Sequence, residues 1–144
     1  MFNPIDNTSY TNGYGKSGIQ IELFFDYLCS ASQAENIDIN ELMTEDWLDG
    51  TVADQIFVKY IPYPVSYNVH SYEVARLVPY FINMCTRDSS KCFSNEYRNY
   101  CYEHLEMVKE NDNISKAEFI TWWSKQVGEN FGISSIDIEA SYDN

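Results

Sequence analysis

Two short apolar runs in the first half of the chain predict β-strands. Residues 19–25 first alternate polar and apolar side chains and then end on an apolar stretch, which indicates a strand whose second half is buried on both faces. Residues 55–61 are rich in β-branched and aromatic side chains, and Pro62 and Pro64 end this strand because proline has no N–H to donate to a neighbour. A helix over 30–42 joins the two runs into a βαβ unit, which predicts parallel strands.

Apolar residues in the rest of the chain recur at helical spacing and predict three helices. The first covers about 72–81 and the second about 97–108. The third follows a capping-box sequence at 115–118, in which the serine and the glutamate side chains each bond to the other's backbone N–H. It ends at Gly128 or Gly132, since glycine is the residue that most easily terminates a helix.

These elements predict one helix-rich α/β domain. Residues 1–17 are polar and contain glycines, which indicates an irregular lead-in, and residues 18–144 form the domain itself. A helical part occupies about 70–131. The acidic tail, 133–144, is compatible with a short strand, a helical turn or disorder.

Charge and composition narrow the classes of partner. The chain has 144 residues with 22 acidic and 9 basic side chains, a net charge of −13, so it lacks the clustered Lys and Arg that nucleic acids and anionic membranes attract. No stretch approaches the roughly 20 apolar residues of a transmembrane helix, so membrane insertion is not expected. The N-terminus does not look like a signal peptide. The protein is therefore expected in the cytoplasm, or in a secretory compartment or outside the cell if a signal peptide was removed.

Four cysteines carry the candidate chemistry: Cys29, Cys85, Cys92 and Cys101. None has zinc-finger spacing and the two histidines stand apart, so no metal site is expected. Cys85 and Cys92 flank a short turn, and a disulfide between them is feasible in an oxidising compartment. Pairing of Cys85 with Cys101 is the alternative disulfide, and free thiols in the core are the alternative to both.

The position of Cys29 makes it the candidate nucleophile. It follows the first predicted strand and precedes a capping-box sequence at 30–33 with Ser30 as the N-cap. A cysteine at a helix N-terminus meets unpaired backbone N–H groups and the positive end of the helix dipole, and both favour the thiolate. The predicted reaction is attack on a disulfide.

The segment around Cys29 resembles the redox-active turn of DsbA-like thioredoxin-fold proteins, in which Asp-Tyr-x-Cys-Pro-x-x-Cys follows the first core strand. Residues 60–75 resemble the Phe-Pro-Leu-Pro-Tyr-His-x-Asn-Ala stretch that opens a helical insertion in one branch of that family. The resemblance covers about 18–135. It implies a thioredoxin-like fold with a large helical insertion, and Cys29 as the attacking cysteine acting on protein or peptide thiols and disulfides.

Two departures from that family pattern change the expected activity. Ser32 stands where the family has its resolving cysteine, so a dithiol cycle is excluded and only monothiol exchange or isomerisation remains. Kappa-class glutathione transferases share the fold and use a serine near this turn, which makes glutathione a candidate cofactor. No proline follows Pro79 to form the family's cis-proline loop, so the sheet is expected to be incomplete. An open sheet edge invites pairing with another chain, and a homodimer is expected.

Three residues are candidates for supporting Cys29, each with a simpler alternative. Ser32 is expected to bond to the Cys29 sulfur or to be an ordinary first-turn serine. Asp26 is expected to relay protons or to fix the turn. His70 is expected to activate Cys29 or to pack in the core. The other functional hypothesis is a redox-inactive thioredoxin-fold module that binds a peptide or protein through a surface away from Cys29. Residues 60–72 are the best candidate for an exposed aromatic surface, and the family pattern gives docking of the helical insertion as their alternative role. An unrelated helical protein with a two-stranded sheet is the alternative for the fold.

Overall fold

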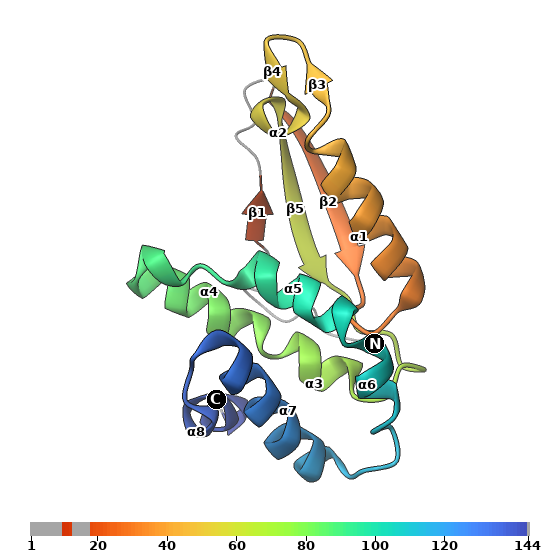
Figure 1. Ribbon diagram of the computed structural model, residues 1–144, viewed down its shortest axis with the longest axis vertical. Coiled ribbons are helices and arrows are strands. Elements are labelled where there is room, and N and C mark those ends of the chain that lie inside the picture. Colours follow the sequence, from red (N-terminus) through yellow and green to blue (C-terminus); the bar gives the residue numbers. More distant parts are fainter. Residues whose placement is uncertain (1–9, 13–17, 144) are drawn as a thin grey trace.

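The main sheet of this α/β domain is small, and it contains the two strands of the predicted βαβ unit and one strand from the N-terminal segment (Figure 1). The computed structural model describes residues 10–12 and 18–143. Strand β2 (Ile19–Phe25) pairs in parallel with β5 (Ile56–Pro62), which confirms the predicted direction. Strand β1 (Tyr10–Asn12) pairs antiparallel with the other edge of β5, giving the order β1-β5-β2. The prediction of an irregular lead-in was therefore wrong at these three residues, and the rest of the lead-in lies outside the described residues.

The connection between β2 and β5 contains more structure than the sequence pattern predicts. Helix α1 (Ser30–Leu42) is followed by a hairpin of β3 (Asp46–Trp47) and β4 (Gly50–Thr51) and by the short helix α2 (Val52–Gln55). The hairpin forms the end of an elongated arm that extends away from the helical part (Figure 1).

Helices make up the rest of the fold, and they are shorter and more numerous than predicted. The expected helices at 72–81 and 97–108 each split in two, the first because Pro79 lies in the opening turn of a new helix. The tail is helical, with the Ser134 side chain capping its first turn. In chain order these elements are α3 (Ser71–Ala75), α4 (Val78–Arg87), η1 (Ser89–Lys91), α5 (Ser94–Glu103), α6 (Leu105–Lys109), α7 (Lys116–Phe131), α8 (Ser135–Ala140) and η2 (Ser141–Asp143).

Helix α7 shows how a local sequence signal fixes an element. The Ser115 and Glu118 side chains form the predicted capping box, and Gly132 ends the helix with a left-handed backbone, φ 64°. Trp123 on its buried face donates from its indole N–H to the Tyr97 hydroxyl, 3.1 Å away, and that hydroxyl in turn donates to the Val74 carbonyl at 2.8 Å. A chain of hydrogen bonds through the aromatic core therefore joins α7, α5 and α3.

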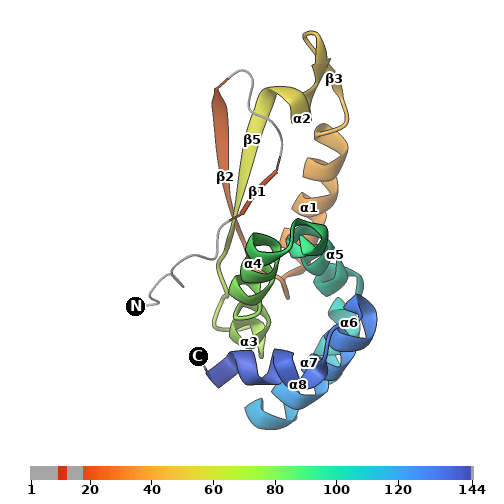
Figure 2. The same cartoon turned by 90° about the vertical axis from the view of Figure 1, so that its left-hand side faces the viewer.

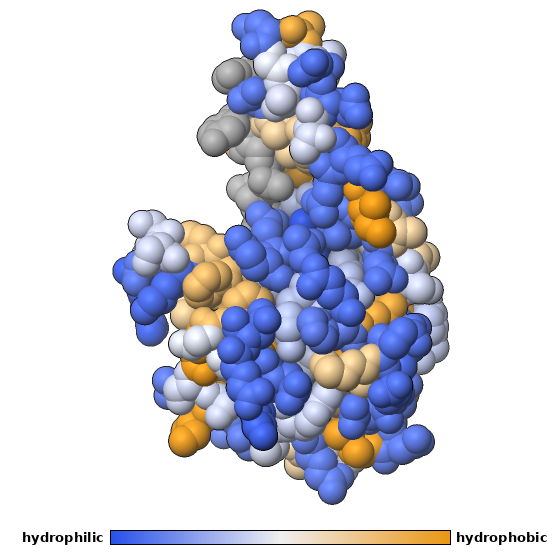
Figure 3. Space-filling view, in the orientation of Figure 1, coloured by the Kyte–Doolittle hydropathy of each residue, from blue (hydrophilic) through white to orange (hydrophobic). Residues whose placement is uncertain are grey.

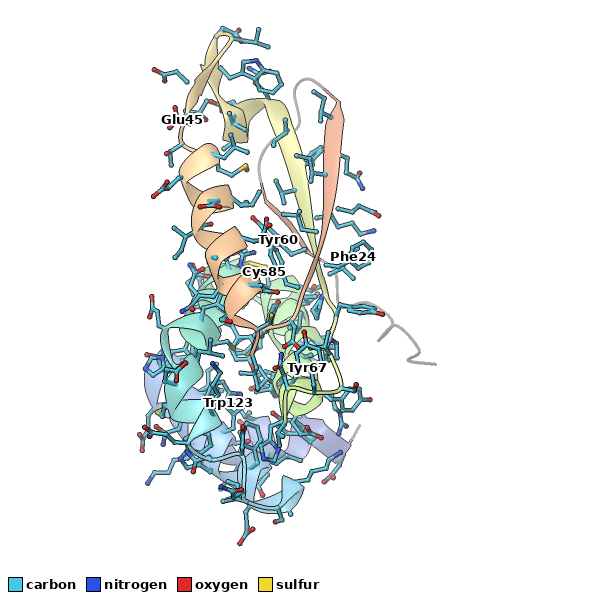
Figure 4. All side chains as sticks on the ribbon, turned by 90° about the vertical axis from the view of Figure 1, so that its right-hand side faces the viewer. Phe24, Glu45, Tyr60, Tyr67, Cys85 and Trp123 are labelled. Carbon is cyan, nitrogen blue, oxygen red and sulfur yellow. A yellow bond between two sulfur atoms is a disulfide. The ribbon has the colours of Figure 1, made fainter. Side chains whose placement is uncertain are left out.

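The two faces of the sheet are unequal, and the expected burial of β2 on both faces was wrong. Only Phe25 of this strand is buried, and Phe24 is 60% exposed. The Phe24 side chain points away from α1, off the opposite face of the sheet (Figure 4). In the part of the chain that the structure describes, helices cover one face of β2 and β5 (Figure 2), and β2 has a neighbour on one edge alone. The expected open edge is present in these residues.

Candidate functional site

Cys29 lies at the turn between β2 and α1. Its backbone is extended, φ −105° and ψ 124°, and its N–H donates to the Asp26 carbonyl at 3.2 Å. The predicted cap at Ser30 was wrong: Cys29 is the N-cap, its side chain makes no capping bond, and the helix begins at Ser30. The turn that starts at Asp26 sets the helix start one residue earlier than the serine pattern indicates. The thiol is free and half-buried.

Asp26 holds this turn against a second loop. Its carboxylate is 4% exposed and accepts hydrogen bonds from the Leu28 N–H, the Val65 N–H and the Asn68 amide, all at 2.8 Å, and from the Ser71 hydroxyl. Each carboxylate oxygen has two donors. Such saturation is the arrangement expected of a group that fixes structure, and it favours the turn role of Asp26 over proton relay.

Ser32 and helix α5 complete the support of the turn. The Ser32 hydroxyl accepts from the Asp26 N–H at 3.3 Å, and among the described residues it makes no hydrogen bond to the Cys29 sulfur. From α5, the Tyr102 hydroxyl donates to the Asp26 carbonyl at 3.4 Å, and the Tyr102 carbonyl accepts from the Gln33 amide at 2.8 Å. The serine therefore braces the backbone before the cysteine, and its predicted catalytic role stays a prediction.

The His70 ring lies against the helical part. It stacks on Phe119 with the ring centroids 4.0 Å apart and an interplanar angle of 6°. The residue is 8% exposed and has a left-handed backbone, φ 64°, at the N-cap of α3. No hydrogen bond joins it to Cys29 within the described ranges. This packing matches the simpler of the two expectations, and activation of Cys29 by His70 stays untested.

The other three cysteines differ sharply from Cys29. Cys85 and Cys92 form a disulfide with their Cα atoms 4.2 Å apart, which confirms the predicted pair and excludes the alternative with Cys101. Cys101 is free but fully buried, and burial raises the pKa of its thiol well above the ordinary value. Among the four, Cys29 alone is both reduced and open to solvent.

Exposed aromatic side chains lie on the loop that Asp26 organises. Tyr63 is 55% and Tyr67 75% exposed, and Tyr63 meets Phe24 edge-on with the ring centroids 6.3 Å apart. Figure 4 shows Phe24 and Tyr67 on the same side of the molecule. The sequence pattern predicts exposed aromatic side chains in 60–72, and Tyr63 and Tyr67 are exposed there, but no local signal links this loop to Asp26.

Neither a metal centre nor a family assignment follows from these features. The described residues contain no group of three or more metal-ligating side chains, and none of their helices is long and apolar enough to cross a membrane. Comparisons with protein-family models, curated proteins and solved structures found no match. The thioredoxin-like assignment accordingly stays a prediction from the residues around Cys29.

Proposed function

We propose that this chain is a thiol–disulfide exchange protein that acts on protein or peptide substrates through the single cysteine Cys29. The observation that carries the proposal is the placement of this thiol. It is free and half-buried, and it caps a 13-residue helix directly after a strand. A nucleophilic thiol must be both reduced and accessible. Cys85 and Cys92 are joined in a disulfide, and Cys101 is buried.

Two features of the surroundings of Cys29 support the proposal. The first turn of α1 leaves its backbone N–H groups pointing at the cap, and it contains no acidic residue despite the strongly negative charge of the chain. The carboxylate of Asp26, three residues before Cys29, is held by four donors that disperse its charge. The rigid turn also keeps the sulfur at the helix end.

The proposed reaction has two steps. The Cys29 thiolate attacks one sulfur of a substrate disulfide, a new bond forms between the two sulfurs, and the second substrate sulfur leaves as a thiolate that takes up a proton. Because Ser32 cannot resolve this mixed disulfide, an external thiol such as glutathione or a substrate cysteine attacks it and releases Cys29. The net result is exchange of one disulfide for another, with no external oxidant.

The parallel β2-α1-β5 unit supports the finer proposal of a thioredoxin-like fold related to DsbA. In that arrangement the nucleophile follows the first core strand, as Cys29 does here. The large helical part after β5 agrees with the insertion that the resemblance implies.

A redox-inactive binding module is the second candidate, and the exposed aromatic loop favours it. Tyr67 and Tyr63 on the loop and Phe24 on β2 present apolar area that the domain itself does not cover. Tyr side chains of this kind are common in protein interfaces.

The rate of alkylation of Cys29 at neutral pH, followed by peptide mass spectrometry, tests the exchange proposal. We expect native Cys29 to react at least about tenfold faster than the same residue in urea, since only the folded chain places it at a helix N-terminus. Ala31 is exposed in the first turn, so Ala31→Glu should slow alkylation about two- to fivefold, whereas the matched Ala31→Gln should not.

A second readout separates the two candidates. Native protein incubated with glutathione disulfide should gain one glutathione on Cys29, and Cys29→Ser should gain none. If native Cys29 is alkylated no faster than in urea, and the two Ala31 variants are alkylated at equal rates, the exchange proposal is rejected and the binding module remains.

A further inference from the structure

A groove lies on the helical part between α4 and α8, and neither Cys29 nor the turn that carries it contributes to its lining. Its volume is about 730 Å³, within the range of small-molecule sites. In Figure 2, α8 lies below α3 and α4, and the space-filling view shows a mixture of hydrophobic and hydrophilic residues over this part of the molecule (Figure 3). The lining residues are Tyr72, Arg76, Pro79, Tyr80, Asn83, Met84, Arg87, Asp137, Ala140 and Ser141.

One wall is formed by α4 and the turn before it, with an arginine at each end. Tyr80, Met84 and Arg87 recur at spacings of three or four residues, so they share one face of α4, and Arg76 lies in the turn between α3 and α4. The step from Tyr80 to Arg87 alone corresponds to about 10 Å along α4, and Arg76 lies beyond Tyr80. The groove is therefore elongated, with an aromatic and apolar middle.

Arg76 and Arg87 stand out because neither forms an ion pair with Asp or Glu among the described residues. All five lysines in the described ranges form ion pairs with Asp or Glu: Lys59, Lys91, Lys109, Lys116 and Lys125. Neither Arg76 nor Arg87 forms one in that part of the chain. Carboxylates outnumber cations by 22 to 9 in this chain, so acidic partners are abundant. Two guanidinium groups that form no ion pair among the described residues line one groove, and they leave the means to bind an anion there.

Arg76 is also held in place. One terminal nitrogen donates to the Tyr142 carbonyl, and the guanidinium carbon lies 5.4 Å from the centre of the Tyr142 ring and 6.0 Å from that of Tyr72. A cation fixed by a carbonyl and two aromatic faces loses little entropy when it binds a ligand. The position of Arg76 therefore resembles a preformed anchor more than a mobile surface residue.

We propose that this groove binds an elongated organic anion with an aromatic or apolar body. The anionic head lies on the guanidinium group of Arg87, and the body packs on Tyr72, Tyr80 and Met84 toward Arg76 at the other end. Asp137 is the one acidic residue of the lining, so the groove carries a net charge of about +1. A single negative charge is thus preferred over a polyanion such as a nucleotide.

Titration of the full chain with anilinonaphthalene sulfonate, followed by fluorescence, tests this proposal. The probe is an aromatic anion, and phenylnaphthylamine has the same rings without the sulfonate. We expect saturable binding of one sulfonate per chain, and binding of the neutral probe about tenfold weaker or more. Equal binding of the two probes, or no saturation, would overturn the proposal.

Variants localise the binding. Arg87→Gln should weaken sulfonate binding about tenfold, while Lys109→Gln, which removes the same charge outside the groove, should not. Asp137→Asn should tighten it severalfold, and Asn83→Trp should block the groove. Far-ultraviolet circular dichroism shows whether each variant is folded. Folded Arg87→Gln and Asn83→Trp proteins that bind as tightly as the parent would place the probe elsewhere and refute the groove.

Discussion

The sheet arm and the helical part of this domain are built in different ways. Residues 18–62 form a thin layer in which the 13-residue helix α1 buries only Asn36 and strand β2 only Phe25. Residues 71–143 enclose a dense aromatic core whose largest members are fully buried: Phe81, Tyr97, Phe119 and Trp123. Most of the apolar burial lies in the helical part, so that part should dominate stability, and the arm depends on its attachment to it.

Charge separates the two regions as well. Residues 26–58 contain eight acidic side chains and no Lys, Arg or His, whereas the arginines and most lysines lie in the helical part. Repulsion among the carboxylates of the arm lowers its own stability and raises its solubility. The candidate nucleophile lies where the arm meets the helical part, at the turn that Asp26 connects to the loop before α3.

The largest expected effect on stability comes from truncating a buried phenylalanine of the helical part, and an exposed phenylalanine of the arm is the comparison. Phe119→Ala should lower the free energy of unfolding by about 3–5 kcal/mol, because it leaves a cavity in a fully buried site. Phe24→Ala on the arm should change it by less than about 1 kcal/mol, because the ring is mostly solvated. Urea denaturation measures both. Similar losses for the two variants would contradict the assignment of the core to the helical part.

Removing the connection should have the next largest effect. Asp26→Ala leaves four donors without their carboxylate and should cost about 3 kcal/mol in urea unfolding. Asp38→Ala removes an exposed carboxylate from α1 and serves as the control, with an expected change within about 0.5 kcal/mol. If the Asp26 variant is as stable as this control, Asp26 does not hold the two regions together.

Alkaline pH should lower the free energy of unfolding by a smaller amount, through the Cys101 thiol in the helical core. Burial raises the pKa of the Cys101 thiol, so the folded protein keeps it protonated while the unfolded chain loses the proton above about pH 8.5. Stability from this group is complete below that pH and falls by about 1.4 kcal/mol for each further pH unit. Between pH 8.5 and 10, Cys101→Ala should lose stability less steeply than the parent in urea titrations. Equal slopes would show that the thiol does not contribute.

Features with a local signal were predictable from the sequence. The parallel βαβ unit follows from two apolar runs and the helix between them, and the cap of α7 follows from Ser115 and Glu118. The Cys85–Cys92 disulfide follows from a short turn between two cysteines. In each case the residues that interact are close in sequence or belong to neighbouring elements.

Features that depend on distant residues were not predictable. Asp26 meets Val65, Asn68 and Ser71 only because β2 and β5 end at the same edge of the sheet. The exposure of Phe24 reflects what covers the sheet, which a hydrophobic pattern does not specify. The groove between α4 and α8 forms because the C-terminal tail packs as a helix. The sequence pattern did not specify the secondary structure of this tail.

The stack of His70 on Phe119 provides a spectroscopic probe of the same connection. The chain has two histidines, so its imidazole proton resonances are few and resolvable by nuclear magnetic resonance. A ring lying 4.0 Å above another ring experiences that ring's current, which moves the His70 signals upfield of their random-coil positions. Because His70 precedes α3 on the loop that Asp26 holds, these chemical shifts report whether the loop is docked on the helical part, without any label or mutation.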